Sequence, residues 1–180
     1  MKEKKITTEI LSTIIYIIIV LLITFLIVTF VVQRTTVEGQ SMEITLNNGD
    51  NLMLDKLTYR FKNPNRFEII VFPHMMENEK MFYIKRVIGL PGETIRIDWE
   101  GNIYINGQIL KEDYGKEIIL DPGIAEKEIE LGENEYFVLG DNRNHSSDSR
   151  DPSVGIIERD EIMGRVWIRI YPLNKIGAVR

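Results

Sequence analysis

An uncharged apolar run near the N-terminus constrains this chain more than any other feature. Residues 14–32 read IIYIIIVLLITFLIVTFVV, 19 residues without a charged side chain. As a helix this run is about 28 Å long, which matches a hydrocarbon core of about 30 Å. Because the run is apolar on every side and not striped, a membrane-spanning helix is favoured over a buried helix of a globular core.

A cleaved secretory signal is the other interpretation, because MKEKK supplies a basic start. The apolar run exceeds the usual signal-peptide core of about 7 to 15 residues, and no small-x-small cleavage site follows it. Lys2, Lys4 and Lys5 precede the run, while only Arg34 follows closely. The positive-inside bias therefore predicts that the N-terminus is cytoplasmic.

Composition divides the chain into an N-terminal cytoplasmic segment 1–13, a transmembrane helix 14–32 and an extracytoplasmic domain 35–180. The net charge is −5, and because the first 34 residues carry +2, the rest carries −7. An acidic domain argues against a nucleic-acid partner, since phosphate binding needs a positive surface. The absence of cysteine excludes disulfides, thiolate metal sites and cysteine nucleophiles.

Beyond residue 35, short β-branched and aromatic runs alternate with Gly, Pro, Asn and Asp, which predicts a mostly β domain. The expected strands are 51–54, 67–72, 82–88, 94–98, 103–105, 135–139 and 164–170. The segment IRIDWEGNIYINGQIL is typical of a hairpin that turns at Glu100 and Gly101. Residues 111–134 are charged enough to form a surface excursion, and the pattern does not indicate which secondary structure they adopt.

Two side chains are candidates for a nucleophile and its base. Ser41 lies about eight residues beyond the apolar run, and a serine hydroxyl attacks only beside a base. Lys85 lies in FYIKRVI, where strand alternation places one cation among apolar neighbours on each face. Burial there would lower its pKa from about 10.4 toward 7 or 8, as a base requires. The alternative is an edge-strand lysine that limits aggregation.

A polar loop and two histidines complete the set of candidates. The loop GDNRNHSSDSR, Gly140–Arg150, is dense in hydrogen-bonding groups, and Asp148 with Arg150 could form a supporting ion pair. His74 lies in a polar stretch typical of a surface loop. His145 precedes Asp148 by three residues, a spacing that does not itself make a triad, so a Ser/His/Asp hydrolase using His145 is a weaker alternative.

Taken in order, these three clusters resemble the motifs of the bacterial type I signal peptidases, membrane-anchored Ser/Lys endopeptidases of peptidase family S26. The nucleophile motif Ser-Met-x-Pro-Thr corresponds to Ser41–Thr45, with Ile44 in place of proline. The base motif corresponds to YIKRVIGLPGE, residues 83–93, and the last motif to Gly140–Arg150. Gly39 and the single anchor resemble the compact Gram-positive form of the enzyme.

The resemblance implies a role for each matching residue. Ser41 would attack the scissile carbonyl after neutral Lys85 takes its proton, and Ser146 would orient the lysine. The backbone N–H of Ser41 would hold the oxyanion, with Gly39 where some members supply a hydroxyl. The residues expected to support the loop are Asp141, Asp148 and Arg150. Those expected to line the substrate pockets are Val37, Met42, Leu46, Tyr83 and Ile84.

We therefore expect an antiparallel, partly closed β-barrel-like catalytic domain tethered by one transmembrane helix to a bacterial plasma membrane. It would remove signal peptides from exported preproteins after Ala-x-Ala-like sequences, with signal peptides and the lipid bilayer as partners. No metal or organic cofactor is implied, and the sequence does not indicate the oligomeric state. The alternative is a catalytically inactive, membrane-tethered module that binds signal peptides, since Ile44 leaves mobile a turn that proline would stiffen.

Overall fold

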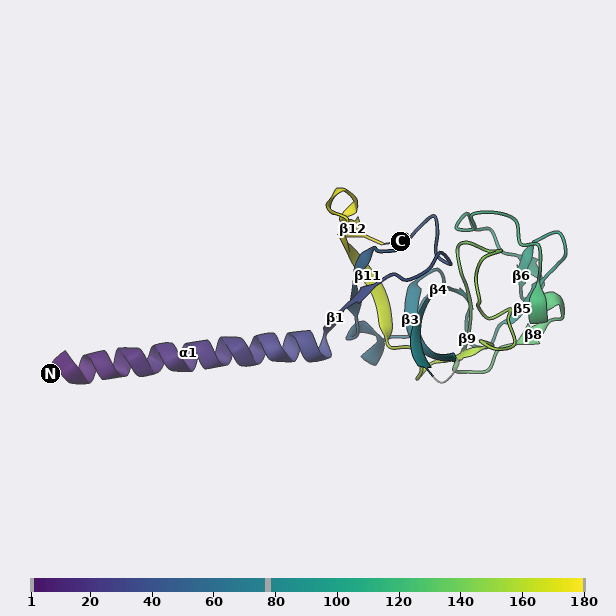
Figure 1. The fold of residues 1–180 in the computed structure, drawn as a ribbon. Helices are drawn as coiled ribbons and strands as arrows, with labels where there is room; N and C mark the ends of the chain where they lie inside the picture. Colours follow the sequence, from purple (N-terminus) through teal and green to yellow (C-terminus); the bar gives the residue numbers. More distant parts are fainter. Residues whose placement is uncertain (1, 77–78, 180) are drawn as a thin grey trace.

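One long helix precedes all of the sheet structure. The computed structural model describes residues 2–76 and 79–179, and its helix α1 (Lys2–Phe30) extends away from the rest of the molecule (Figure 1). The window Glu9–Leu26 has a mean hydropathy of 2.6 and is not buried against the protein, so its length and composition suffice to cross a membrane. The helix ends before residue 32, where we expected its end, because Val32 already pairs with Asp55 in a sheet.

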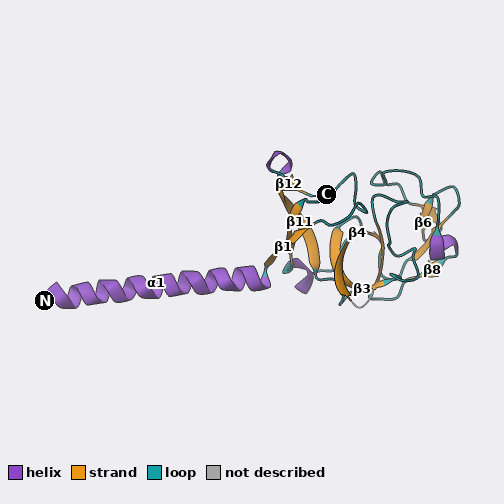
Figure 2. Cartoon of the chain, viewed as in Figure 1, coloured by secondary structure: helices purple, strands orange, loops and turns teal. Residues whose placement is uncertain are grey.

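Two antiparallel sheets follow α1 (Figure 2). The larger sheet has the spatial order β1 (Val32–Thr36), β2 (Asn51–Asp55), β11 (Gly164–Tyr171), β3 (Ile69–Met76), β4 (Glu79–Gly89), β9 (Glu135–Leu139) and β10 (Ile157–Glu158), and β12 (Gly177–Ala178) pairs with β11. The smaller sheet has the order β7 (Gln108–Ile109), β6 (Ile103–Ile105), β5 (Thr94–Ile97) and β8 (Ile129–Glu130). Three short 3-10 helices are η1 (Thr58–Arg60), η2 (Gly123–Glu126) and η3 (Leu173–Lys175).

The expected mostly antiparallel β fold with one N-terminal apolar helix is confirmed, but the expected partial closure into a barrel is not. Across the described residues, no ladder joins the first strand of the larger sheet, β1, to β4 or to β10. The sheet instead leaves an open cavity between the chain around β1 and the first half of β4. The ladder between β4 and β9 begins only at Arg86, so the part of β4 before Arg86 borders this cavity.

The expected strands all have counterparts, and five further strands were not expected. The strand expected to begin at residue 67 begins at Ile69, because Phe67 has a φ of 71°. The strands β1, β7, β8, β10 and β12 were not predicted. Of these, β7 had a usable signal: Asn106 and Gly107 form the tight turn between β6 and β7 with φ values of 50° and 74°, which is the preferred Asn-Gly hairpin turn.

The segment 111–134 is more than the surface excursion that its charge indicated. Ile119, Ala125 and Leu131 are buried in the core cluster of the smaller sheet, together with Ile95 and Phe137. Spaced apolar residues fix this charged segment to the core, and they anchor it behind the polar loop Gly140–Arg150.

Candidate active site

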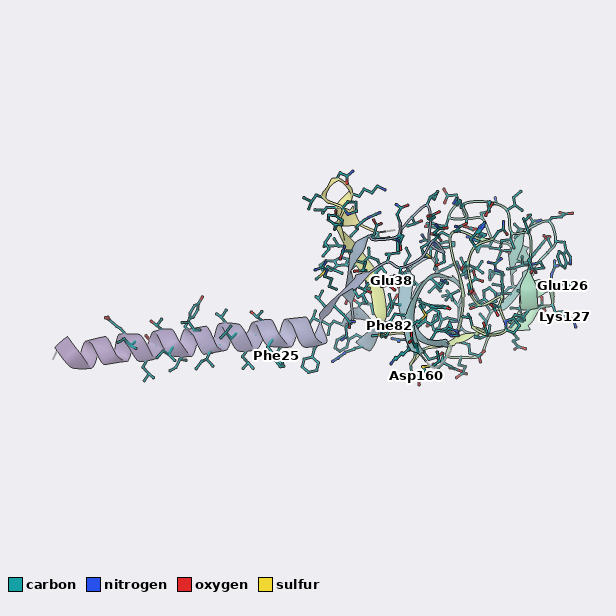
Figure 3. The ribbon with its side chains drawn as sticks, in the orientation of Figure 1. Phe25, Glu38, Phe82, Glu126, Lys127 and Asp160 are labelled. Atoms are coloured by element: carbon teal, nitrogen blue, oxygen red, sulfur yellow. The ribbon has the colours of Figure 1, made fainter. Side chains whose placement is uncertain are left out.

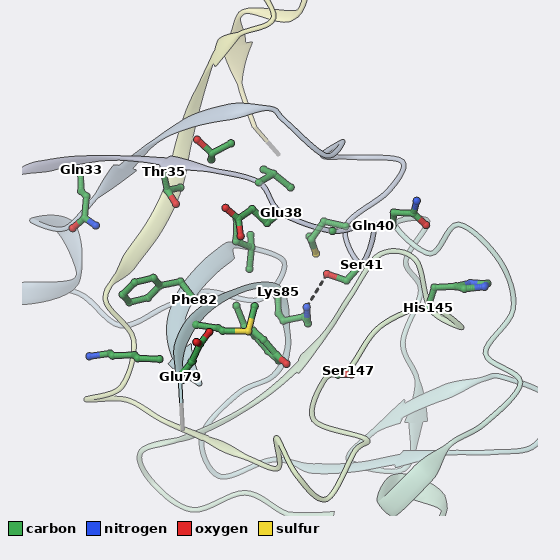
Figure 4. Close-up of a pocket in the computed structure, with 18 of the residues that line it drawn as sticks. Gln33, Thr35, Glu38, Gln40, Ser41, Glu79, Phe82, Lys85, His145 and Ser147 are labelled. Carbon is green, nitrogen blue, oxygen red and sulfur yellow. Dashed lines mark hydrogen bonds between the residues drawn. The ribbon is translucent and has the colours of Figure 1, made fainter. Parts of the chain in front are cut away.

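The side chains of Ser41 and Lys85 meet in the cavity, at the end away from α1. They lie 44 residues apart in sequence, and the Nζ of Lys85 donates a hydrogen bond of 2.8 Å to the Oγ of Ser41 (Figure 4). Lys85 is 3% exposed. Burial lowers the pKa of Lys85 from 10.5 to about 8, although the negative charges of Asp148 and Asp141 act in the opposite direction. Lys85 is therefore an amine that can be neutral near physiological pH beside a serine hydroxyl.

The polar loop Gly140–Arg150 holds the turn that carries the nucleophile. The backbone N–H of Asn142 donates to the carbonyl of Ser41 over 3.0 Å, and its side-chain amide donates to the carbonyl of Gln40 over 3.0 Å. A Cβ at Gly140 would lie 2.5 Å from the carbonyl oxygen of Ser41 and closer still to Ser146 Oγ. Only glycine allows the two segments to approach this closely.

A buried ion pair joins the base strand to this loop. The guanidinium of Arg86 donates to both carboxylate oxygens of Asp141, at 2.8 and 2.7 Å, and both side chains are fully buried. The hydroxyl of Thr45, four residues beyond Ser41, donates to the same carboxylate over 2.5 Å. The ring of Tyr114 covers the guanidinium at 3.8 Å. This network fixes the turn around Ser41 against β4.

A second bidentate pair braces the same loop, as the sequence indicated. The guanidinium of Arg150 donates to both oxygens of Asp148, at 2.8 and 2.9 Å, and also to the carbonyl of Arg143. The backbone N–H of Gly140 donates to Asp148 over 3.0 Å. Asp148 therefore sets the start of the loop that contacts Ser41.

The expected hydrogen bond between Ser146 and Lys85 is not formed. Ser146 Oγ is buried against Gly140 and has no hydrogen-bond partner among the described residues. In this arrangement the hydroxyl that receives the Lys85 hydrogen bond is that of Ser41. Orientation of the lysine by Ser146 therefore rests on the family resemblance alone.

One backbone donor remains available beside the nucleophile. The N–H of Gly39, where φ is 91°, donates to the side chain of Asn48 over 3.0 Å. Within the described part of the chain, the N–H of Ser41 makes no hydrogen bond to a protein acceptor. The N–H of Ser41 is therefore available to a further acceptor, whereas that of Gly39 is already engaged.

Four of the five expected pocket residues line the cavity, whose volume is about 850 Å³. These four are Val37, Met42, Tyr83 and Ile84. Leu46 is fully buried in the core cluster that also contains Met42, and it does not line the cavity. The backbone N–H of Leu46 donates to the carbonyl of Met42 over 2.8 Å, within the turn that follows Ser41.

Neither histidine forms a hydrogen bond with Ser41 within the residues that the structure describes. His145 lines the far end of the cavity, but its exposed ring points away from Ser41 in Figure 4. Its Nδ1 lies 3.7 Å from a carboxylate oxygen of Glu117. The ring of His74 packs on that of Tyr83 with centroids 4.7 Å apart. The hydrogen bond from Lys85 and these positions favour a lysine over a histidine as the base.

Comparison with known proteins identifies the family. The family model described as signal peptidase, peptidase S26, matches residues 10–171. The chain belongs to this family. The expected membership is thereby confirmed, and the enzyme class that goes with it is a serine peptidase.

Named relatives of this signal peptidase family member come from several bacteria. The chain is 39% identical to signal peptidase I of Leptolyngbya laminosa over 150 residues, which cover 79% of this chain and 70% of that protein. It is 38% identical to the probable signal peptidase I-2 of Synechocystis over 147 residues, 79% of this chain and 65% of that protein. It thus spans about two thirds of the Synechocystis protein. A crystal structure of signal peptidase I from Enterococcus faecalis matches with a TM-score of 0.46 and 35% identity, covering 58% of this chain and 97% of that chain.

Several site residues were not predicted from the sequence. Asn142 and Thr45 each hold the nucleophile turn through one side chain, and Arg86 holds it through Asp141. The sequence did contain a signal for Arg86. Strand alternation places it among apolar residues, as the single cation on the face opposite Lys85. The sequence could not show that Tyr114, from the segment 111–134, would cover its guanidinium.

We expect Asp141→Ala to lower the free energy of unfolding by about 3 to 5 kcal/mol, because it leaves the Arg86 guanidinium buried without its carboxylate. Urea unfolding of the full chain in detergent, followed by circular dichroism, measures this change. The matched control is Glu43→Gln, which removes the half-exposed pair with Lys116 and should cost less than about 1 kcal/mol. Equal effects of the two substitutions would contradict a structural role for the buried pair.

Proposed function

We propose that this protein removes signal peptides from preproteins with a Ser41/Lys85 dyad. The observation that carries the proposal is the 2.8 Å hydrogen bond between the buried, low-pKa lysine and the serine hydroxyl. Membership of the signal peptidase family and the names of its relatives support the substrate class.

The reaction needs one base and one backbone donor. Neutral Lys85 takes the proton of the Ser41 hydroxyl as Oγ attacks the scissile carbonyl, and the Ser41 N–H stabilises the resulting oxyanion. The ammonium of Lys85 then gives its proton to the leaving amine, and an acyl ester on Ser41 remains. Lys85 next takes a proton from a water molecule, whose oxygen attacks the ester. The returning proton restores the Ser41 hydroxyl and releases the carboxylate end of the signal peptide.

The open edge beside the dyad suits an extended substrate. The cavity runs from Gln33, near the end of α1, along the first half of β4 to Ser41. A peptide added as a strand beside β4 would present alternate residues to Val37, Met42 and Ile84, which are large and buried. Small side chains at the two inward positions fit such a surface, which favours cleavage after Ala-x-Ala-like sequences.

The helix α1 supports a membrane tether with a cytoplasmic N-terminus, because its basic start and apolar span follow the positive-inside pattern. The cavity begins at Gln33, three residues beyond the end of this helix. A signal peptide held in the same bilayer would therefore reach the cavity at its membrane-proximal end. Confinement of enzyme and substrate to one plane raises their effective concentration.

We expect Ser41→Ala and Lys85→Ala each to abolish cleavage, and the double variant to be no slower than either, because the two groups act as one unit. Steady-state cleavage of a purified preprotein, with N-terminal sequencing of the product, measures this. Additive losses would contradict the dyad. His145→Ala should retain activity. Loss of activity in this variant would support the alternative Ser/His/Asp triad.

A serine-directed acylating inhibitor separates an enzyme from an inactive binding module. It should label Ser41 in the unaltered chain and leave Lys85→Ala unlabelled, with Ser41→Ala as the blank. An unlabelled, inactive chain that still binds signal peptides would favour the binding module. In that case, Ile44→Pro would show whether Ile44 causes the loss of activity.

We expect kcat/KM to rise with pH up to about 8 and then to level, because only the neutral form of Lys85 accepts the serine proton and its pKa is lowered to about 8. Activity is therefore lost as pH falls through about 8. A pH series of initial rates checks this. An acid limb near the free-lysine value of about 10.4 would show an exposed lysine, and one near 6.5 would indicate a histidine base.

We expect cleavage to fall about 5- to 150-fold when Leu or Phe replaces Ala at either outer position of the Ala-x-Ala sequence, since overpacking costs about 1 to 3 kcal/mol. The same replacement at the middle position should be tolerated, because alternation turns that residue to solvent. A peptide series compared by kcat/KM tests both statements. Equal rates for Leu and Ala at the outer positions would refute the pocket assignment.

A further inference from the structure

A second cavity, of about 420 Å³, lies where α1 meets the sheet domain, apart from the dyad. It is formed by the chain just after α1, by the segment around η1 and by β11. Its apolar lining comprises Val31, Val32, Leu57, Phe61 and Trp167, and its polar lining comprises Asp55, Thr58, Lys62 and Arg165. We call it the helix-exit groove.

The aromatic side chains of the helix-exit groove are turned outward. Phe61 is 80% exposed and Trp167 is 47% exposed. The register of β11 on β2 shifts between Val166 and Ile168, so Trp167 is the extra residue of a bulge, a feature that re-aims a side chain. Clustered exposed aromatic residues beside an apolar cavity indicate a contact surface and not a core.

The lining of the groove has two cations, of which Arg165 is shared between the carboxylates of Asp55 and Glu68. Its carboxylate, Asp55, is already paired with Arg165 over 3.1 Å and accepts hydrogen bonds from Thr58. Lys62 is exposed and forms no ion pair with any residue that the structure describes. Nearby, the guanidinium of Arg60 lies 5.8 Å above the ring of Phe30, the last residue of α1. An uncompensated cation therefore stands at the rim of an apolar cavity.

The position of the groove identifies what fills it. Val31 and Val32 are the last residues of the uncharged run, and Arg34 is the first charged residue after it. If α1 spans the bilayer, as proposed above, this depth is the boundary between hydrocarbon and headgroups, where aromatic and basic side chains gather. A lipid would therefore meet the apolar lining with its acyl chain and Lys62 with its phosphate.

We propose that the helix-exit groove binds an anionic phospholipid of the leaflet into which α1 emerges. The acyl chain lies along Leu57, Phe61 and Trp167, and the headgroup phosphate pairs with Lys62. This inference rests on the proposed membrane span of α1 but not on the peptidase activity. It also gives the catalytic domain a second attachment, which limits its rotation about the end of α1 and holds the membrane-proximal end of the substrate cavity near the surface.

The two tryptophans allow a direct test, because Trp167 lies in the groove and Trp99 lies at the opposite end of the molecule. Trp99 bonds to Glu126, which Figure 3 labels at the end far from α1. The full chain with Trp99→Phe is placed in nanodiscs of zwitterionic lipid that contain brominated phosphatidylglycerol or, in parallel, brominated phosphatidylcholine. We expect Trp167 to be quenched preferentially by the brominated anionic lipid. The reciprocal variant Trp167→Phe, which retains Trp99, should be quenched by neither.

Charge variants test the headgroup contact. Lys62→Gln should lower the preference for the anionic lipid about fivefold, the effect expected for one basic residue at a membrane surface. The matched control is Lys127→Gln, an exposed lysine beside Glu126 that Figure 3 labels at the distal end. This control should leave the preference unchanged. Equal quenching by the two lipids, or equal effects of the two variants, would overturn the proposal.

Further controls separate this inference from the statements on which the function rests. Tyr16→Trp, with both natural tryptophans replaced by Phe, reports whether α1 is in the bilayer. If the tryptophan at position 16 is quenched and Trp167 is not, the membrane span of α1 is supported and the lipid site is overturned. Quenching of Trp167 that needs two chains in one disc, or added signal peptide, would assign the groove to a second copy or to substrate and also overturn it. Cleavage of a soluble peptide by Lys62→Gln should stay unchanged, which shows an intact fold.

Discussion

The amine of Lys85, held among apolar side chains against the hydroxyl of Ser41, is the interaction on which the site depends. Its pKa of about 8 lies below the unfolded value of 10.5, so between these pH values the folded protein binds fewer protons than the unfolded chain. Stability therefore rises with pH across that window, and below about 8 the charged lysine destabilises the fold. The fold tolerates a penalty of roughly 3 kcal/mol at neutral pH in order to place a base there.

Two buried arginine–carboxylate pairs limit how far the nearby negative charges oppose the lowering of the Lys85 pKa by burial. Burial lowers the pKa of Lys85, and the charges of Asp148 and Asp141 raise it against that larger effect. Each carboxylate is bound on both oxygens by a guanidinium, from Arg86 and Arg150 respectively, so most of its charge is balanced locally. Loss of either arginine would expose Lys85 to an unbalanced negative charge as well as loosen the loop. The ion pairs therefore tune the base in addition to holding the backbone.

The sequence predicted the features whose signals are local in the chain, and it did not predict those that depend on residues far apart in sequence. Strands with clear alternation and the apolar helix were predicted because their signals are local. The motif residues Ser41 and Lys85 were predicted by resemblance, and the fold brings them together. Other features depend on tertiary contacts, which leave no periodic pattern in the local sequence. These are the packing of Tyr114 on Arg86, the hydrogen bond from Asn142 to the nucleophile turn and the burial of Leu46. The expected partial closure into a barrel was not confirmed, because alternation describes strands and not which edges pair.

The same open edge that makes the sheet incomplete is also what a peptidase for extended substrates needs. An exposed strand edge invites pairing with any chain, and proteins limit this with charged residues. Here β4 begins with Glu79 and Lys80 beside its open stretch, and the chain around β1 carries Arg34 and Glu38 across the cavity. Because the catalytic groups stand at the inner end of this edge, a peptide must first pass these charges in an extended form. If α1 holds the domain at a membrane, as proposed above, that attachment also restricts which peptides reach the open edge.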